Sequence, residues 1–437
     1  MKRRKDSKNR VLKEGEYERS NGTYEYKWRS RTGKRHSVYA RTLAELRDKE
    51  IDILKDTYDG IDQDSSNLTI NDEYKKWKTL KRGLKANTYE NYKYMYEQYV
   101  MPEFGKCKLS VIKKTDIRGF YNTLYDVRGL KSSTIDVIQT VMHQIFQMAV
   151  DDDIIRNNPS DNALKELKRA HGDDIEKREA LTVKQASTLI RFLQNLSSVY
   201  HHWLPIITVL LFTGMRVGEV TGLQWDDIDF ENDIIDVNHT LVYYSKRSEQ
   251  SKHGECKFEV HSTKTYAGNR RIPMLPVVKD AFLQEKKYQE EIGLKCCVNI
   301  NGYTDFIFIN KDGGCLHQGT LNKAFRRIIR DCNYAVLDKS LKDSVRLPHF
   351  SCHYMRHTCA TYMKDEAHMD EDIRKEILGH VSDDVTNRVY THNTDEYKRE
   401  EMFKLIPVSN IIFGTYDQNT TDLRPLTKSY KEIHDNA

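Results

Sequence analysis

The spacing of apolar and polar residues changes along the chain and divides its 437 residues into three kinds of segment. Near the N-terminus, residues 24–29 alternate between the two classes, residues 32–34 form a Thr-Gly-Lys turn, and residues 36–39 alternate again. Alternation on both sides of a glycine turn predicts a β-hairpin. A helical period follows from Leu43 to about Tyr58. We therefore expect a small β-sheet backed by one helix.

Residues 68–159 have a helical period throughout, with apolar residues recurring at intervals of three and four. This pattern predicts an all-α domain of four helices. The polar stretches 59–67 and 161–178 predict a linker on either side of it. The apolar stripes of the four helices are, in order, Trp77 and Leu80; Tyr89, Tyr92, Tyr96 and Tyr99; Ile117, Phe120, Tyr121 and Leu124; and Ile135, Ile138, Met142, Ile145, Phe146 and Ala149.

The remaining residues mix both periods and predict a mainly helical α/β domain. Thr182 and Gln185 form a capping box that opens a helix, and residues 203–212 form an apolar helix. Short strands are expected at 234–237 and 306–309, with a long hairpin between them whose polar tip lies at 246–253. The fold class is thus multidomain α+β, with a sheet-bearing, an all-α and a mixed domain.

Chemistry-bearing residues gather between His349 and His392. An apolar stripe predicts a helix after Ser351, and it places His353 and Arg356 three residues apart on neighbouring faces. A second short helix is closed by Gly379, and His380 and Tyr390 follow. Arginine holds anionic oxygens, histidine exchanges protons near neutral pH, and tyrosine can act as a nucleophile. Together these residues predict phosphoryl transfer to a tyrosine without a metal.

Composition narrows the setting in which this chemistry would act. The chain has no run of about 18 apolar residues and no apolar segment in its N-terminal MKRRKDSKNR, so we expect neither a membrane span nor a secretory signal. Its eight irregularly spaced cysteines suggest reduced thiols and a cytoplasmic location.

Positive charge is concentrated at the N-terminus. The net charge is +5, yet residues 1–41 alone carry 14 Lys+Arg against 5 Asp+Glu. Basic and aromatic residues interleave on the predicted strands, so the sheet could enter a DNA major groove; the alternative is a hairpin with solvated charges only. The expected DNA contacts are Tyr26, Trp28, Arg29, Arg31, Lys34 and Arg35.

Five motifs stand in a fixed order along the chain: TGMRVGEV at 213–220, STKTYAGNRRIP at 262–273, HYMRHTCAT at 353–361, LGH at 378–380 and VYTH at 389–392. In these motifs the chain resembles the tyrosine recombinases, most closely the integrases of conjugative transposons and temperate phages. The resemblance implies that the catalytic residues are Arg216, Lys264, His353, Arg356, His380 and Tyr390.

The same resemblance implies roles for these residues. Two arginines and His353 would hold the scissile phosphate, Lys264 would protonate the leaving 5′-hydroxyl, and Tyr390 would form a 3′-phosphotyrosine. Glu219 would orient Arg216. No cofactor is expected. No metal is expected either. His353 and His357 are four residues apart, as in a zinc-binding helix, but Tyr354 occupies the position where such a helix carries a glutamate.

The resemblance also implies an organisation and partners. We expect an arm-type DNA-binding domain with a small three-stranded β-sheet at 1–62, an all-α core-binding domain at 68–160, a mixed, mainly-α catalytic domain at 178–400 and a tail at 401–437. The partners would be double-stranded DNA at core and arm sites and three further copies in a homo-tetramer, with an excision factor or a DNA-bending protein as candidates. A type IB topoisomerase-like enzyme and a non-catalytic DNA-binding regulator are the alternatives.

Two points stay open from sequence alone. Arg270 and Arg271 could contact phosphate or simply flank their strand. The apolar residues beyond the proposed nucleophile could complete their own core or pack onto the next protomer of a tetramer; these residues are Met402, Phe403, Leu405, Ile406, Val408, Ile411, Ile412 and Phe413.

Overall fold

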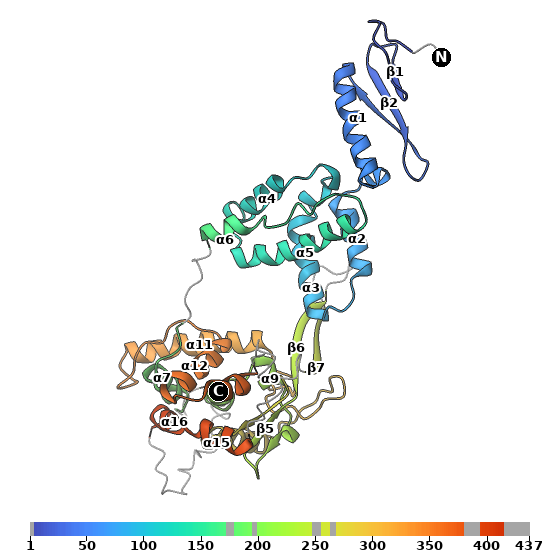
Figure 1. The fold of residues 1–437 in the computed structure, drawn as a ribbon. Helices are drawn as coiled ribbons and strands as arrows, with labels where there is room; N and C mark the ends of the chain where they lie inside the picture. The colour runs from blue at the N-terminus through green and yellow to red at the C-terminus, as the bar shows by residue number, and fades with distance from the viewer. Residues whose placement is uncertain are drawn as a thin grey trace. The chain divides into compact units, whose positions relative to one another are not determined.

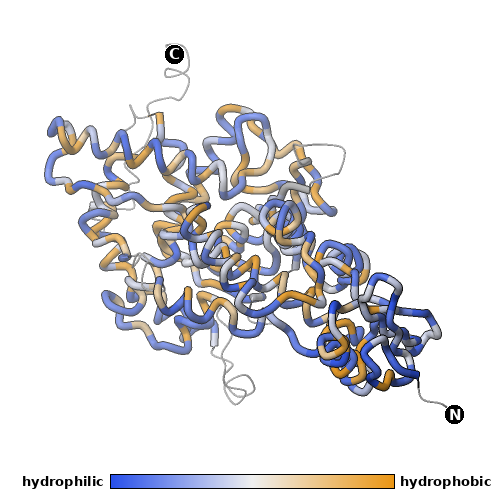
Figure 2. Tube along the Cα trace, turned by 90° about the horizontal axis from the view of Figure 1, so that it is seen from above, coloured by the Kyte–Doolittle hydropathy of each residue, from blue (hydrophilic) through white to orange (hydrophobic). Residues whose placement is uncertain are grey.

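The computed structural model describes residues 4–171, 179–194, 199–246, 255–262, 268–379 and 394–414 (Figure 1). The chain divides into two compact units, Met1–Glu176 and Lys177–Ala437. Along the helices of both units, hydrophobic and hydrophilic positions alternate in short runs (Figure 2). Such alternation is typical of elements that bury one face.

The N-terminal part is a three-stranded antiparallel sheet with one helix against it, as predicted. The strands β1 (Glu16–Glu18), β2 (Tyr24–Arg29) and β3 (Arg35–Ala40) are hydrogen-bonded in that order, and α1 (Leu43–Tyr58) follows. The Thr42 hydroxyl accepts the backbone N–H of Glu45 and thereby begins α1. The core between sheet and helix consists of Tyr24, Tyr26, Ala40, Leu43 and Leu46.

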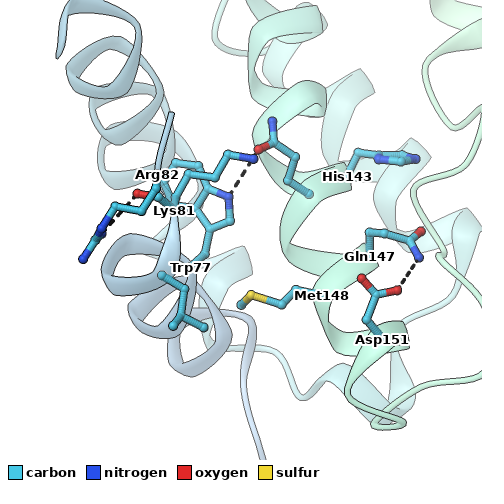
Figure 3. A pocket seen from close by; sticks show the side chains of 9 residues that line it. Trp77, Lys81, Arg82, His143, Gln147, Met148 and Asp151 are labelled. Atoms are coloured by element: carbon cyan, nitrogen blue, oxygen red, sulfur yellow. Dashed lines mark hydrogen bonds between the residues drawn. The ribbon is translucent and has the colours of Figure 1, made fainter. Parts of the chain in front are cut away.

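The predicted four-helix domain is also present. Its helices are α2 (Ile70–Leu80), α3 (Ala86–Met95), α4 (Lys114–Asp126) and α5 (Ser132–Asp151), and α3 continues as a π-helical turn, Tyr96–Val100. The apolar stripe of α5 lies at the centre of this core. Trp77 and Met148 line an open cleft of about 380 Å³ between α2 and α5 (Figure 3), where the Trp77 indole N–H donates to Gln144.

Two predictions about element boundaries are wrong. Residues 161–171 are not a linker, because they contain the helix α6 (Lys165–His171). Ala163, Leu164 and Leu167 are buried in the four-helix core, although charged neighbours hide them in the sequence. Residues 306–309 form only isolated bridges, from Phe306 to Gln224 and from Ile309 to Cys315, and their apolar side chains are buried without a strand.

The second unit is built around a helix that is buried on all sides, α8 (Leu204–Thr213). Its other described helices are α7 (Val183–Gln194), α9 (Val217–Gly222), α10 (Pro276–Ile292), α11 (Gln318–Leu337), α12 (Cys352–Thr361), α13 (Glu371–Leu378), α15 (Asp395–Phe403) and α16 (Ile406–Phe413). None of the helices in the described ranges is both long and apolar enough to cross a membrane.

Two small sheets complete this unit. The strands β4 (Ile228–Asp229), β5 (Ile234–Val237) and β8 (Arg270–Pro273) form one sheet in that order. The strands β6 (His239–Lys246) and β7 (Glu255–Ser262) form the predicted long hairpin, which extends away from the helices of the unit (Figure 1). The predicted tip of the hairpin lies largely outside the described residues.

The start of the C-terminal tail completes the core of its own unit. Met402, Leu405, Val408 and Ile412 are buried in the main hydrophobic cluster, and the ring of Phe413 lies 6.0 Å from that of Phe212. These residues therefore complete their own core, which was the first of the two alternatives, whereas Ile411 on the same helix is 64% exposed. The physical reason is that α8 and α7 offer these apolar side chains a nearby surface to cover.

One buried acid makes the stability of this unit depend on pH. Glu285 on α10 is 7% exposed and accepts a hydrogen bond from Gln289 Nε2 at 2.7 Å. Burial, which outweighs that bond, raises the pKa of Glu285 from 4.5 to about 7. The folded state then keeps a proton that the unfolded state releases. The contribution of the protonated Glu285 to the free energy of unfolding is therefore fully present below about pH 4.5 and is lost, by roughly 3 kcal/mol, as the pH rises to about 7.

We predict that Glu285→Gln increases the free energy of unfolding above about pH 7 and leaves it nearly unchanged near pH 4. Urea unfolding of the full chain at several pH values measures this. Glu290→Gln, an exposed change on the same helix, serves as the control and should shift stability by less than about 0.5 kcal/mol. A gain that is equal at all pH values would contradict the assignment.

Candidate active site

Arg216 lies at the junction between α8 and α9, and Glu219 fixes it there. α8 ends at Gly214 with a left-handed backbone (φ 64°), and Arg216 is extended (φ −71°, ψ 150°). Glu219 accepts the backbone N–H of Arg216 at 2.8 Å and its guanidinium at 2.9 Å. The Arg216 side chain remains 46% exposed, whereas that of Glu219 is 4% exposed. A buried carboxylate thus holds an arginine that can still reach a ligand.

Arg356 on α12 is buried beside this junction. It donates from one guanidinium nitrogen to the carbonyl of Gly214 at 2.7 Å and from the other to the carbonyl of Leu378 at 2.6 Å. Burial, together with the nearby charge of Arg216, lowers the pKa of Arg356 to about 10. The group therefore stays charged at neutral pH, and its two backbone bonds fix the direction in which the guanidinium points.

A third arginine, Arg270 on β8, completes the cluster. It donates to both carboxylate oxygens of Glu219 and, through Nε, to the carbonyl of Ile377 at 2.6 Å. Arg216 in turn donates to the carbonyl of Gly379 at 3.2 Å. Three consecutive carbonyls at the end of α13, those of residues 377–379, therefore accept hydrogen bonds from three different arginines.

Positive charges outnumber negative charges in this cluster. Burial alone would raise the pKa of Glu219, but the hydrogen bonds and charges of Arg270 and Arg216 outweigh burial and lower it. One carboxylate therefore stands among three guanidiniums, and the cluster is positive overall. Arginine forks match the oxygens of phosphate and carboxylate groups. The arrangement is suited to holding one anionic group beside Arg216.

The other residues predicted for the site are described only in part. His353 is exposed on α12, one helical turn before Arg356. Lys264, His380 and Tyr390 lie outside the described residues, although His380 directly follows Gly379. The structure thus brings together Arg216, Glu219 and Arg356. Within the described ranges, no three or more His, Cys, Asp or Glu residues are grouped so that they could hold a metal.

The sequence left open whether Arg270 contacts phosphate or only flanks its strand. The structure places it in the buried cluster, with 6% of its surface exposed. The sequence could have indicated this burial, because alternation along residues 270–273 places Arg270 on the same face of the strand as the apolar Ile272. Arg271 lies on the opposite face, 47% exposed, with Asp236 and Asp395 as partners.

The aromatic residues expected to contact DNA point into the N-terminal core. Tyr26 is 7% exposed, its ring stacks on Trp28 at 5.6 Å, and Trp28 donates to Gln63. The prediction that these two rings contact DNA does not fit this packing, because both face α1. Arg29, Arg31, Lys34 and Arg35 are exposed, as an interface requires.

The open face of the N-terminal sheet carries residues that sequence reasoning missed. Lys27 lies over the ring of Tyr17 at 5.0 Å, and Arg19 lies over the ring of Tyr39 at 4.9 Å. Both tyrosines are exposed, at 41% and 48%. The period of two along β2 could have revealed this face, because it separates Lys27 and Arg29 from Tyr26 and Trp28.

Three family profiles match the chain. That of the Phage integrase family matches residues 179–397, which is half of the chain. That of the DNA binding domain of tn916 integrase matches residues 1–57. That of the Phage integrase, N-terminal SAM-like domain matches residues 69–125.

Individual proteins resemble the chain over most of its length. It is 28% identical over 420 residues to the transposase from transposon Tn1545 of Streptococcus agalactiae, covering 92% of this chain and 96% of the relative. The transposase from transposon Tn916 of Enterococcus faecalis gives the same identity and coverage. A structure of the Tn1549 transposon integrase in complex with transposon right end DNA has a TM-score of 0.61 at 28% identity, covering 78% of this chain and 100% of that chain.

We predict that Glu219→Gln strongly destabilises the second unit. The amide keeps the shape of the side chain but leaves the buried Arg270 without a counter-charge, which typically costs about 3–5 kcal/mol. Calorimetric unfolding of the full chain measures the change. The matched control is Glu231→Gln, an exposed glutamate of the same unit. Equal unfolding midpoints for the two variants would show that the buried charge needs no partner.

Proposed function

The chain belongs to the phage integrase family, and from this membership we propose that it is a site-specific tyrosine recombinase. It would cleave and rejoin DNA to integrate and excise a mobile element. The observation that carries the proposal is the meeting of Arg216 and Arg356, from separate elements, at the end of α13. His380 follows that end by one residue.

In the proposed reaction, the Tyr390 oxygen attacks the scissile phosphorus while the bond to the 5′-oxygen breaks. The new bond is a 3′-phosphotyrosine, and the tyrosine proton passes to a neighbouring base. Lys264 supplies the proton that the leaving 5′-oxygen takes up. Rejoining is the same step in reverse with another 5′-hydroxyl. One phosphodiester replaces another, so the reaction needs neither ATP nor a cofactor.

The described residues support the electrostatic part of this mechanism. Negative charge grows on the non-bridging oxygens during in-line attack, and fixed donors stabilise it without reorganising. Arg356 is fixed by two backbone carbonyls, and Arg216 is fixed by Glu219 while nearly half exposed. Each such donor typically contributes roughly 3 kcal/mol to the transition state. His353 would add a third donor.

We assign the arm-type DNA contacts to the open face of the N-terminal sheet, which carries Lys27, Arg29 and Arg35. The matching profile at residues 1–57 is that of a DNA-binding domain, and this supports the assignment. Residues 68–160 and 178–400 would bind the core site. Strand exchange would require four copies of the chain on DNA, and an excision factor or a DNA-bending protein would select the direction.

We predict that Tyr390→Phe removes the covalent DNA adduct and leaves DNA binding intact. Only the phenolic oxygen is lost, so a suicide substrate should trap adduct with the wild type and none with the variant, on denaturing gels. Tyr397→Phe, which changes an exposed tyrosine on α15, is the control and should cleave normally.

An adduct that persists in Tyr390→Phe would assign the nucleophile to another of the 26 tyrosines. Relaxation of supercoils without strand exchange would instead indicate a topoisomerase.

We predict that Arg29→Gln weakens binding to arm-site DNA and reduces the slope of log K against log salt by about 1, since one phosphate contact is lost. Lys55→Gln removes the same charge from the exposed part of α1 and should leave affinity within about twofold. Fluorescence anisotropy at several salt concentrations measures both. Equal losses would place the interface elsewhere than on the open sheet face.

A further inference from the structure

Arg270 forms no part of the reaction described above, and we propose that it is a positioning residue for DNA cleavage. It holds Glu219 in the orientation that aims Arg216, and it fixes the end of α13 from which the His380 segment begins. This inference rests on the proposed recombinase function, but the hydrogen-bonding link can be tested without it.

Arg270 is buried too deeply to hold a phosphate. Its side chain is 3% exposed, and hydrogen bonds take up four of its five N–H groups. The acceptors are the carboxylate oxygens of Glu219 and the carbonyls of Ile377 and Gly268. Any effect of Arg270 on the reacting phosphate must therefore pass through these partners.

The first partner is the carboxylate that Arg216 also uses. One Glu219 oxygen accepts from the Arg216 backbone at 2.8 Å and from Arg270 at 2.9 Å, and the other accepts from both guanidiniums. Sharing the carboxylate divides its charge between two arginines. Without Arg270, the full charge of Glu219 would act on Arg216 and draw its guanidinium back from a bound phosphate. Arg270 thus keeps Arg216 available to its ligand.

The second partner is the end of α13, which its own cap leaves incomplete. The Gly379 N–H returns to the carbonyls of Glu376 and Lys375, as a left-handed glycine permits (φ 64°). Within the part of the chain that the structure describes, no backbone N–H donates to the carbonyl of Ile377, and Arg270 Nε does so. The position of residues 377–379 therefore depends on a strand, β8, that lies far away in sequence. Because His380 comes next, β8 also sets where its segment starts.

A lysine cannot replace this fork. Arg270 grips two carboxylate oxygens and a carbonyl at once because its donors lie in one rigid plane, whereas a lysine has a single ammonium point charge. Arg270→Lys keeps the positive charge beside Glu219 and removes the geometry. The substitution therefore separates charge balance from positioning.

The experiment compares Arg270→Lys with the wild type in the full chain, on a suicide substrate. We expect the single-turnover cleavage rate to fall ten- to a hundredfold, since a shift of about 1 Å can cost that much. The dissociation constant for core-site DNA should stay within about twofold. The control is Phe282→Leu, a core change on α10 outside the cluster. Assayed at a temperature where both variants are folded, it should cleave at the wild-type rate.

Glu219→Asp provides a second route if Arg270→Lys does not fold. It keeps the charge but is too short to reach both arginines, so it should give the same loss of rate at unchanged affinity. A wild-type rate in either variant would overturn the proposal. So would a loss of affinity in step with the rate, or an equal loss in Phe282→Leu.

Hydrogen exchange separates this inference from the function on which it rests. Arg270→Lys should speed amide exchange in the peptide that ends at Gly379 and leave α10 unchanged. If the wild type forms no adduct but Arg270→Lys speeds amide exchange at the end of α13, the proposed function is wrong, whereas the dependence of α13 on Arg270 is confirmed. If the wild type cleaves and exchange at α13 is unaltered, only the positioning role fails.

Discussion

The second unit depends on one constraint, which is that the last carbonyls of α13 must find donors in a place where water is largely excluded. A buried carbonyl without a partner costs roughly 1–3 kcal/mol, and a bond from a charged donor is among the stronger replacements. Three arginines from β8, α12 and the α8–α9 junction supply these donors. The same bonds bring three elements, distant in sequence, to one point. Satisfying the end of a helix therefore also assembles the candidate site.

Gathering three guanidiniums creates repulsion that the fold must offset. Glu219 does so from within the cluster, and its two oxygens are shared between Arg216 and Arg270. The pKa of Arg356 is nevertheless lowered, because burial and the charge of Arg216 still destabilise its charged form. An anionic ligand would relieve that cost further. We infer that the site is less stable than an apolar core would be and is ready to bind a phosphate.

In the N-terminal sheet, the two faces of β2 carry different kinds of residue. Along β2, one face must cover α1 and the other meets solvent. Tyr24 and Tyr26 are buried with Leu46 on the first face, while Lys27 and Arg29 remain exposed on the second. The packing of the aromatic residues thus determines where the basic residues point. This division supports a sheet that presents charge, and not aromatic rings, to a nucleic acid.

Local patterns in the sequence were sufficient for elements whose period is strong. The ranges of β2 and α1, the apolar stripe of α5, the Thr182–Gln185 capping box and the glycine end of α13 were all predictable, because each depends on neighbours a few residues away. The five ordered motifs likewise indicated the family and the arginines at 216 and 356. The tertiary structure decided the rest. Leu164 and Leu167 belong to a core that their charged window hides, and Tyr26 faces a helix that its strand alone does not reveal. Arg270 could be assigned only from its contacts, because its partners lie 51 and 107 residues away. The spacing of apolar residues along a helix or strand indicates which of its faces is buried. It does not indicate which distant residue forms a hydrogen bond with that face.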